Sequence, residues 1–521
     1  MMTTTSFGLQ SDTYPELIAT FANRPVDAVA VRDESTALTY RELYERIGSL
    51  AAWLSDHGVA PGDTAAMMIA SSAELLIAQL ATQAVGAVGA LVNTSLVGQA
   101  LRHVIEIACS KTILADPDSA AQLRQESLPC HSTDDPDMAG ALGGGLDPIT
   151  FLRQRSCAAT DPAFINFTSG TTGFPKGVVL EQRTSSRAML IGALLGLQDG
   201  SESLYIPTPI YHAMGLALAS MGLRLGATLI LRRHFSASNF WSDIRDNRCT
   251  LTYYVGTIPR MIFNQPPNPL DAHHELKAFL GGGMPADIWE EFATRFNVKI
   301  IESYSASDTV GTFNNFGNAP VGSVGQPSPD IEARLVDADG VEVAVGEPGE
   351  LLVRPRQRTA DPAIVYYRDD QATREKNEGG WVHTGDLMRA DAAGNYYYVD
   401  RLRHMIRRRG VNIASREIED ILAAHHSIAE CAAIAVPSPL GEDDIKVVVR
   451  PADDALSEKD VADIAAALLP KHMCPRYVEL VAELPLTITQ RVKQFELKQG
   501  WQTATTWDVE AGTYPFRKSH V

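Results

Sequence analysis

Hydrophobic and polar positions change their period along the chain, and this change separates helices from strands. Thr39 and Glu42 have the spacing of a capping box at the start of a helix. The apolar residues that follow recur on one helical face, namely Leu43, Ile47, Leu50, Ala51 and Leu54. The apolar run 65–70 is typical of a buried strand, and a helical pattern follows over 73–82. This alternation predicts an α/β fold in which helices cover mostly parallel β-sheets.

The composition of the chain changes near residue 400. Six arginines fall within sixteen residues: Arg401, Arg403, Arg407, Arg408, Arg409 and Arg416. We therefore predict a large N-terminal domain over 1–400 and a small, mobile α+β C-terminal lid over 401–521. The elements predicted in the lid are helices over 415–425 and 458–469 and strands over 432–436 and 446–450.

Charge and cysteine content exclude several classes of protein. The chain has 521 residues, with 45 Lys+Arg against 63 Asp+Glu, a net charge of −18. Such a charge argues against binding to nucleic acid or to an anionic membrane surface. The six cysteines form no CxxC pair, so neither a zinc site nor a disulfide framework is indicated. We find no basic, apolar leader and no run of about 18 apolar residues, and therefore expect a soluble, cytoplasmic protein without a membrane span.

Two segments rich in small or polar residues look like loops. Residues 134–146 are rich in glycine and aspartate and are predicted to form a surface loop. Residues 167–177 combine hydroxyl side chains, glycines and Lys176 directly after an apolar run. Glycine backbone, hydroxyls and a lysine together can bind a polyphosphate, although the spacing is not that of P-loop NTPases. On its own, such a segment is more often a flexible loop.

Four further motifs follow the glycine-rich segment in order and change this interpretation. They are 281–285, 302–308, 384–386, and Asp400-Arg401 running into Arg409-Gly410. With them the chain resembles the acyl-adenylate-forming superfamily, which includes acyl-CoA synthetases, adenylation domains of peptide synthetases and beetle luciferases. The segments 234–241 and 264–268 are most similar to the fatty-acid transport protein and carnitine-CoA ligase branch. The resemblance covers about Thr39 to Lys498.

The resemblance implies a nucleotide site residue by residue. The phosphate loop is matched by Thr168, Ser169, Gly170, Thr171, Thr172 and Lys176. The segment that lines adenine and the acyl group is matched by Gly281, Gly282, Gly283, Met284 and Pro285. The motif that carries the adenine-stacking ring is matched by Ser303, Tyr304, Ser305 (in place of a glycine) and Ser307, the last a hydroxyl for the α-phosphate. Asp386 matches the acid that binds both ribose hydroxyls, and Arg401 the arginine that supports it.

Taken singly, three of these residues have ordinary structural explanations. Asp386 alone would be a turn residue, and Tyr304 alone a core aromatic. His212 could be a structural histidine, but the family places it at the acyl pocket. Asp308 takes the place of a glutamate that binds Mg²⁺ in the family, and its shorter side chain would move the metal or insert a water.

The catalytic cation of the lid has two candidates. The common family pattern has Gly-Lys where Gln490 and Arg491 stand, whereas the transport-protein branch indicates a lysine two residues later, at Lys493. A guanidinium is a broader group than an ammonium. The sequence therefore favours Lys493, with Arg491 as the alternative.

These residues predict an ATP-dependent enzyme that activates a carboxylic acid as acyl-AMP with Mg²⁺ and releases pyrophosphate. Coenzyme A is the first candidate acceptor, since Arg407, Arg408 and Arg409 suit its phosphates. An amine is the second, with His212 as a possible base, which would make the protein an amide bond synthetase. A third hypothesis, from the departures at Asp308 and Gln490-Arg491, is a nucleotide-binding protein that has lost catalysis. The family also predicts rotation of the lid about Arg403.

Overall fold

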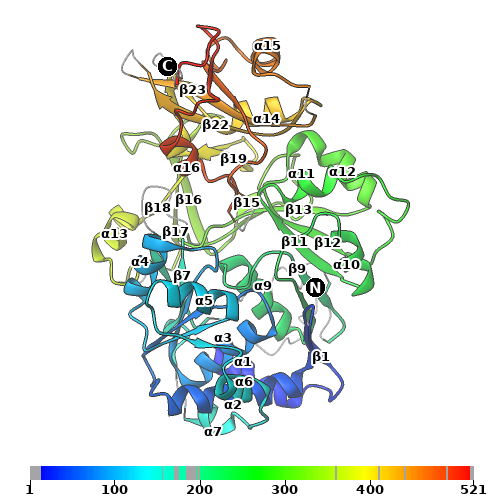
Figure 1. Cartoon of the computed structure of the whole chain (residues 1–521), viewed down its shortest axis with the longest axis vertical. Coiled ribbons are helices and arrows are strands. Elements are labelled where there is room, and N and C mark those ends of the chain that lie inside the picture. The colour runs from blue at the N-terminus through cyan, green and yellow to red at the C-terminus, as the bar shows by residue number, and fades with distance from the viewer. Residues whose placement is uncertain are drawn as a thin grey trace.

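The architecture was described from a computed structural model (Figure 1). The residues described are 13–154, 157–168, 175–183, 196–197, 200–357, 361–408, 411–438, 442–453, 455–487 and 491–516. Two large, mostly parallel sheets form the lower part of the molecule in Figure 1, and a smaller unit lies above them. The α/β prediction is confirmed.

The first large sheet has nine strands. Their order is β15 (Gln326–Pro327), β14 (Phe313–Asn314), β13 (Ile300–Tyr304), β12 (Ala278–Gly282), β11 (Leu251–Val255), β9 (Ser203–Ile206), β10 (Thr228–Leu231), β1 (Val29–Arg32) and β2 (Ala37–Thr39). Strands β13 to β1 in this order pair in parallel, while β2, β14 and β15 pair antiparallel at the two edges. Tyr304 is the last residue of β13. It therefore lies at the edge of the sheet where the parallel strands have their carboxyl ends.

The second large sheet has six strands. Their order is β6 (His131–Ser132), β5 (Thr112–Ala115), β3 (Thr64–Met68), β4 (Val88–Leu91), β7 (Pro162–Phe167) and β8 (Gly177–Glu181). All neighbours are parallel except β7 and β8, which flank the predicted phosphate loop.

Helices fill the space between the two sheets and cover their outer faces. One hydrophobic core joins side chains of both sheets to those of α1 (Tyr14–Thr20), α2 (Tyr40–Asp56), α3 (Ala73–Val85), α6 (Pro136–Gly143), α7 (Ile149–Arg153) and α9 (Ala213–Arg224). The outer face of the nine-stranded sheet packs on α10 (Phe240–Asp246), α11 (Ile258–Phe263) and α12 (Trp289–Phe296). The outer face of the six-stranded sheet packs on α4 (Gly98–Ala108) and α5 (Pro117–Gln125). The N-terminal part is therefore layered as helix, sheet, helix, sheet, helix.

The capping box predicted for α2 is present. The Thr39 hydroxyl accepts from the Glu42 N–H at 3.2 Å, and the Glu42 carboxylate accepts from the Thr39 N–H at 2.7 Å. The apolar face predicted for this helix is buried.

The loop predicted over 134–146 is wrong, because α6 lies there. Pro136 occupies the first helical turn, where its missing N–H costs nothing. Met138 and Leu142, four residues apart, are buried in the core shared with α2. Gly140 between these two residues and the glycines at 143–145 concealed the apolar spacing.

A third sheet connects the large domain to the lid. It is antiparallel, with the order β16 (Ile331–Val336), β17 (Gly349–Pro355), β18 (Val382–Ala390) and β19 (Tyr396–Arg401). Helix α13 (Asp370–Lys376) lies between β17 and β18 in the chain.

The small unit follows β19. It contains a hairpin, β20 (Ile406–Arg408) and β21 (Val411–Ile413), and a four-stranded sheet of β22 (Ile428–Pro437), β23 (Asp443–Pro451), β24 (Tyr477–Leu480) and β25 (Trp507–Asp508). Its helices are α14 (Ser415–Ala423), α15 (Glu458–Leu468) and α16 (Gln494–Gln499). Every element predicted here from the sequence is present. No helix among the described residues is long and apolar enough to cross a membrane.

Candidate active site

A buried carboxylate lies where the nine-stranded and antiparallel sheets meet. Antiparallel pairing of β18 with β19 sets Asp386 opposite Arg401. Arg401 Nε lies 2.6 Å from Asp386 Oδ1, and the Tyr304 hydroxyl donates to Asp386 Oδ2 at 2.6 Å. None of the Asp386 side chain is exposed. Three residues from three separate motifs and two sheets therefore form one polar group.

The charges in this group are coupled. Burial raises the pKa of Asp386, and the neighbouring Arg401 and the Tyr304 hydrogen bond oppose that shift. Burial disfavours the charged form of Arg401, but Asp386 outweighs it and raises the pKa of the guanidinium. The pair is held as an ion pair because each partner compensates the desolvation of the other.

Asp308 forms a second group with two residues that carried no signal in the sequence. The Tyr366 hydroxyl and Lys376 Nζ each donate to Asp308 Oδ2 at 2.8 Å. Burial raises the pKa of Asp308, but Lys376 and the two hydrogen bonds outweigh it, so the pKa lies below its usual value. Within the described residues no hydrogen bond reaches Oδ1.

The glycine motif at the end of β12 is fixed by close backbone contacts. A Cβ on Gly281 would lie 2.2 Å from the Tyr254 carbonyl oxygen, and one on Gly282 would lie 2.7 Å from the Ser303 carbonyl oxygen. Gly283 has φ of +104°. Larger residues are excluded at the first two positions by contact and disfavoured at the third by conformation.

Glu302 lies beneath this motif and accepts three hydrogen bonds. They come from the Gly283 N–H (2.5 Å), the Met284 N–H (3.2 Å) and the Tyr254 hydroxyl (2.5 Å). Burial raises the pKa of Glu302 to about 7, against these hydrogen bonds. In the sequence, Glu302 is only the first residue of the motif 302–308. Its partner Tyr254 lies 48 residues away, so a local pattern cannot reveal the contact.

His212 begins α9 beside Tyr211. Burial, and next the charge of Arg491, lower the pKa of His212 to about 4. Its Nε2 is buried and has no hydrogen-bond partner among the described residues. His212 is therefore neutral near pH 7, with one ring nitrogen unused.

The lid places its two candidate cations differently. The charge of Arg491 lowers the pKa of both His212 and Asp386. Burial among protein groups, and then Arg401, lower the pKa of Arg491 itself. Lys493 instead pairs with Glu496 at 2.9 Å, one turn along α16. In this conformation Arg491, and not Lys493, lies within electrostatic reach of the nucleotide-site residues.

The remaining predicted residues divide into three groups. Thr168 and Lys176 close the base of the phosphate loop, since the Thr168 N–H donates to the Lys176 carbonyl at 2.9 Å. Ser303 donates to the Gly281 carbonyl at 2.9 Å, while Ser305 and Ser307 lie beyond β13, ahead of Asp308. Outside the described residues lie Ser169, Gly170, Thr171, Thr172, Arg409, Gly410 and Gln490.

The coenzyme A role expected of Arg408 needs correction. Arg408 is buried, donates to the His472 and Cys474 carbonyls at 3.1 and 2.6 Å, and lies 3.3 Å from Asp444. A guanidinium with these partners stabilises the lid core and is not presented to a ligand. Arg407 is exposed.

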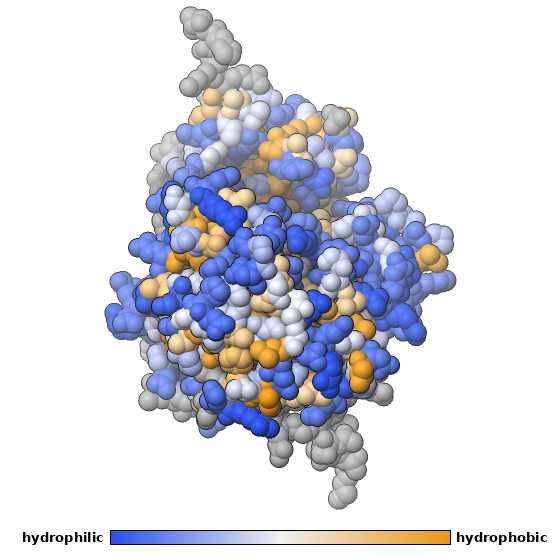
Figure 2. All heavy atoms as spheres, turned by 60° about the horizontal axis from the view of Figure 1, so that its bottom comes forward, coloured by the Kyte–Doolittle hydropathy of each residue, from blue (hydrophilic) through white to orange (hydrophobic). Residues whose placement is uncertain are grey.

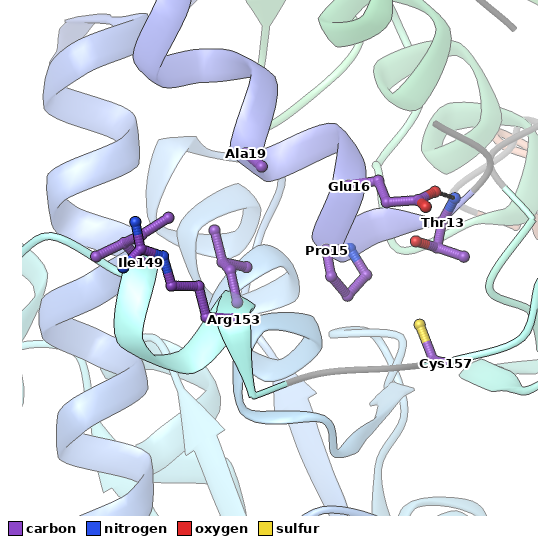
Figure 3. Close-up of a pocket in the computed structure, with 8 residues that line it drawn as sticks. Thr13, Pro15, Glu16, Ala19, Ile149, Arg153 and Cys157 are labelled. Carbon is purple, nitrogen blue, oxygen red and sulfur yellow. Dashed lines mark hydrogen bonds between the residues drawn. The ribbon is translucent and has the colours of Figure 1, made fainter. Parts of the chain in front are cut away.

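A separate pocket lies between α1 and α7 (Figure 3). The residues that line it are Thr13, Pro15, Glu16, Ala19, Ile149, Leu152, Arg153 and Cys157. Its Glu16 carboxylate already accepts from the Thr13 N–H at 3.0 Å in the capping box of α1. The pocket shares no residue with the groups described above.

Comparison with known families identifies the family of the chain. The AMP-binding enzyme family matches residues 18–359, and the AMP-binding enzyme C-terminal domain matches residues 417–491. The chain belongs to this family. The two matched ranges leave the segment around residue 400 uncovered, so the domain boundary at 400/401 stays a prediction.

Relatives and solved structures agree with the family. A medium/long-chain-fatty-acid–CoA ligase of Mycobacterium tuberculosis is 31% identical over 509 residues, which cover 92% of this chain and 84% of that protein. ATP-bound MatB of Rhodopseudomonas palustris superimposes with a TM-score of 0.78 at 23% identity, covering 97% of this chain and all (100%) of that one. The amide bond synthetase McbA of Marinactinospora thermotolerans has a TM-score of 0.75 at 23% identity, covering 94% and 100%. The protein is an AMP-forming ligase with the fold of adenylate-forming enzymes.

Proposed function

We propose that the protein activates a carboxylic acid with ATP, releases pyrophosphate, and transfers the acyl group from acyl-AMP to coenzyme A. The observation that carries the proposal is the buried Asp386 carboxylate between Arg401 and Tyr304 in an AMP-binding enzyme. A carboxylate has about four acceptor positions. Two are used here, which leaves two for the neighbouring hydroxyls of a ribose.

Tyr304 has two roles in this proposal. Its hydroxyl orients Asp386, and its ring offers a surface on which adenine stacks. The glycine motif brings backbone, without side chains, to the same edge of the sheet. Because Asp386 is fully enclosed, nucleotide entry requires neighbouring groups to move, and a lid that carries Arg491 provides such a motion.

Arg491 is the cation proposed for the adenylation step. A carboxylate that attacks the α-phosphate of ATP is repelled by it, so the site must supply positive charge at the reacting oxygens. Arg491 has its charge near Asp386 and His212, whereas Lys493 is paired with Glu496. This reverses the order of preference inferred from the sequence alone. Thr168, Lys176 and the loop between them are proposed for the outer phosphates.

Mg²⁺ is proposed to bind at Asp308. Oxygen ligands suit this ion, and Oδ1 of Asp308 has no bonded donor within the described part of the chain, although Lys376 on Oδ2 partly neutralises the carboxylate. Bound there, Mg²⁺ would neutralise charge on the ATP phosphates. Lys376 and Tyr366 hold Asp308 in place whether or not the ion is bound.

Coenzyme A is favoured over an amine as acceptor. The relative from Mycobacterium tuberculosis is named as a CoA ligase and covers nearly the whole chain. An amine acceptor needs a base to take its proton, and the best base has a pKa near the working pH. His212 has an unused ring nitrogen, but its pKa near 4 makes it a weak base at pH 7. This observation keeps the amide reaction as the second candidate and ranks it below thioester formation.

A panel of aliphatic and aromatic acids tests the proposal. Pyrophosphate release would be measured with ATP and each acid, first alone, then with CoA, then with a primary amine, and the products identified by mass. We expect acid-dependent pyrophosphate release and a thioester only when CoA is added. Amide without thioester would move the second candidate ahead. Absence of pyrophosphate release with every acid would indicate a nucleotide-binding protein that has lost catalysis.

A further inference from the structure

Two histidines and an aspartate gather at the end of the molecule farthest from the lid. His57 ends α2, His131 begins β6, and Asp137 lies in the first turn of α6. Helices α2 and α6 lie at the bottom of Figure 1, whereas α14 to α16 lie at the top. Figure 2 turns this end toward the reader and shows a mostly hydrophilic face with scattered hydrophobic groups. Nothing in the adenylation reaction uses these residues.

Their ligand atoms are close enough to share one metal ion. One ligand atom from each residue lies within 4.8 Å of the other two. His57 Nε2 lies 3.7 Å from Asp137 Oδ2. The donor atoms of a tetrahedral zinc ion, each about 2.0–2.1 Å from the metal, are about 3.3 Å apart. The separation of His57 Nε2 and Asp137 Oδ2 is therefore close to that of two zinc ligands, and Asp137 is 56% exposed.

A second observation independently points to a ligand. The Nδ1–H of His57 donates to the Trp53 carbonyl oxygen at 2.8 Å, which leaves Nε2, 3.7 Å from Asp137 Oδ2, as the nitrogen that can bind a metal. The indole N–H of Trp53 donates to Asp137 Oδ2 at 3.1 Å. Metal-binding histidines and carboxylates are commonly oriented by such outer hydrogen bonds.

Ring packing fixes the two imidazoles further. Trp53 stacks on His57 with centroids 3.8 Å apart and meets His131 edge-on at 4.9 Å. The rings of the two histidines are themselves 5.1 Å apart and nearly perpendicular. Trp53 therefore contacts all three members of the group and fixes their positions, although His57 and Asp137 are exposed.

We propose that His57, His131 and Asp137 form a zinc site that clips the end of α2 to β6 and the start of α6. Two imidazoles and one carboxylate suit Zn²⁺ rather than Mg²⁺, which prefers oxygen ligands only. Three protein ligands leave a fourth position for water. The zinc site joins segments about 80 residues apart in the chain. Because zinc binds only the folded form, it stabilises this end of the large domain.

The test is a zinc titration of the full-length protein without an affinity tag, followed by calorimetry in a buffer that does not bind metal. The variants are His57→Ala, His131→Ala and, as a change that keeps the Trp53 hydrogen bond, Asp137→Asn. His273→Ala removes an exposed histidine elsewhere and is the matched control. Circular dichroism without metal establishes that each variant is folded, and Mg²⁺ is titrated in parallel.

We expect the wild type and His273→Ala to bind one zinc ion more than His57→Ala and His131→Ala, with a zinc-dependent rise in melting temperature. Affinity should fall about 100-fold or more in the histidine variants, since loss even of an outer partner of a ligand lowers metal affinity about 10–100-fold. Trp53→Phe, which keeps the ring and removes the indole N–H, should lower affinity about tenfold. Equal stoichiometry and affinity in the wild type and the ligand variants, or no zinc binding by the wild type, would overturn the proposal.

Discussion

The strand ends around Asp386 and the lid segment around Arg491 are both proposed to form the nucleotide site, but the sequence alone predicts the first more directly than the second. On the strands, the pairing register of β18 with β19 decides which residues meet, and Asp386 can only face Arg401. On the lid, Arg491 and Lys493 are two residues apart and lie outside every helix and strand, and the Arg491 carbonyl accepts from the Thr487 N–H at 2.7 Å. A regular sheet fixes the direction of each side chain, whereas outside such an element the tertiary structure decides it.

The largest expected effect separates the two lid residues. Arg491→Ala should lower the rate of acid-dependent pyrophosphate release by about 10²–10³-fold, because it removes a preorganised charge from the transition state. Lys493→Ala should stay within a few-fold of the wild type, since it loses only a solvent-exposed pair with Glu496. Arg491→Lys should restore part of the activity.

The rate of pyrophosphate release decides between the two cations. Nucleotide binding, followed by fluorescence titration with ATP, should change little in either variant. An inactive Lys493→Ala together with an active Arg491→Ala would return the catalytic role to Lys493.

A second test concerns the strand region and uses stability. The pKa of Glu302 is about 7 when folded, against a usual value of 4.5. Because the folded protein holds this proton more tightly, the stabilisation from Glu302 is complete below pH 4.5 and is lost as the pH rises through 7. At about 1.4 kcal/mol per pKa unit, the loss amounts to about 3 kcal/mol.

Glu302→Gln keeps an acceptor oxygen and removes the titration. The free energy of unfolding in denaturant, measured between pH 4.5 and 8, should therefore depend less steeply on pH in this variant than in the wild type. Glu290→Gln, on the exposed side of α12, is the matched control. Parallel pH curves for the wild type and Glu302→Gln would show that Glu302 ionises normally.

The third prediction tests whether Asp386, the residue paired with Arg401, binds the ribose of ATP. Asp386→Asn should raise KM for ATP by about 10–100-fold, because hydrogen bonds to a charged group contribute about 1.5–3 kcal/mol. KM for the carboxylic acid should change little. Initial rates at varied ATP and fixed acid, and the reverse, measure both constants. An unchanged KM for ATP would remove Asp386 from the nucleotide site.

The sequence anticipated the parts of the molecule that local pattern controls. The capping box of α2 and the helices and strands of the lid follow from local spacing. The meeting of Asp386 with Arg401 was implied by the resemblance to the family, and the pairing of β18 with β19 gives its structural reason. Helix α6 was missed because its glycines resemble a loop while Met138 and Leu142 are buried. The prediction that Arg408 binds a ligand is wrong, and a run of arginines does not show which member turns inward.

The contact between Lys376 and Asp308 could not be predicted from the sequence. Lys376 lies in α13, outside every motif, and reaches Asp308 across 68 residues of chain. Only the docking of α13 beside Asp308 brings its ammonium to the carboxylate. A partner at this separation, with no spacing rule, leaves no trace in a single sequence.

The smallest expected effect sharpens this last point. If Lys376 and Mg²⁺ share the carboxylate of Asp308, then Lys376→Met should lower the Mg²⁺ concentration for half-maximal pyrophosphate release about fivefold, which corresponds to about 1 kcal/mol for one ion pair. Tyr366→Phe removes a neutral donor from the same oxygen and should have a smaller effect. Lys376→Met also removes the cation that lowers the pKa of Asp308, so the pKa of this carboxyl should rise. On acidification at limiting Mg²⁺, the variant should therefore lose activity at a higher pH than the wild type. A Mg²⁺ dependence identical in the wild type and both variants would place the metal away from Asp308. The aspartate that stands here in place of the family's glutamate would then affect packing around Tyr366 and not catalysis.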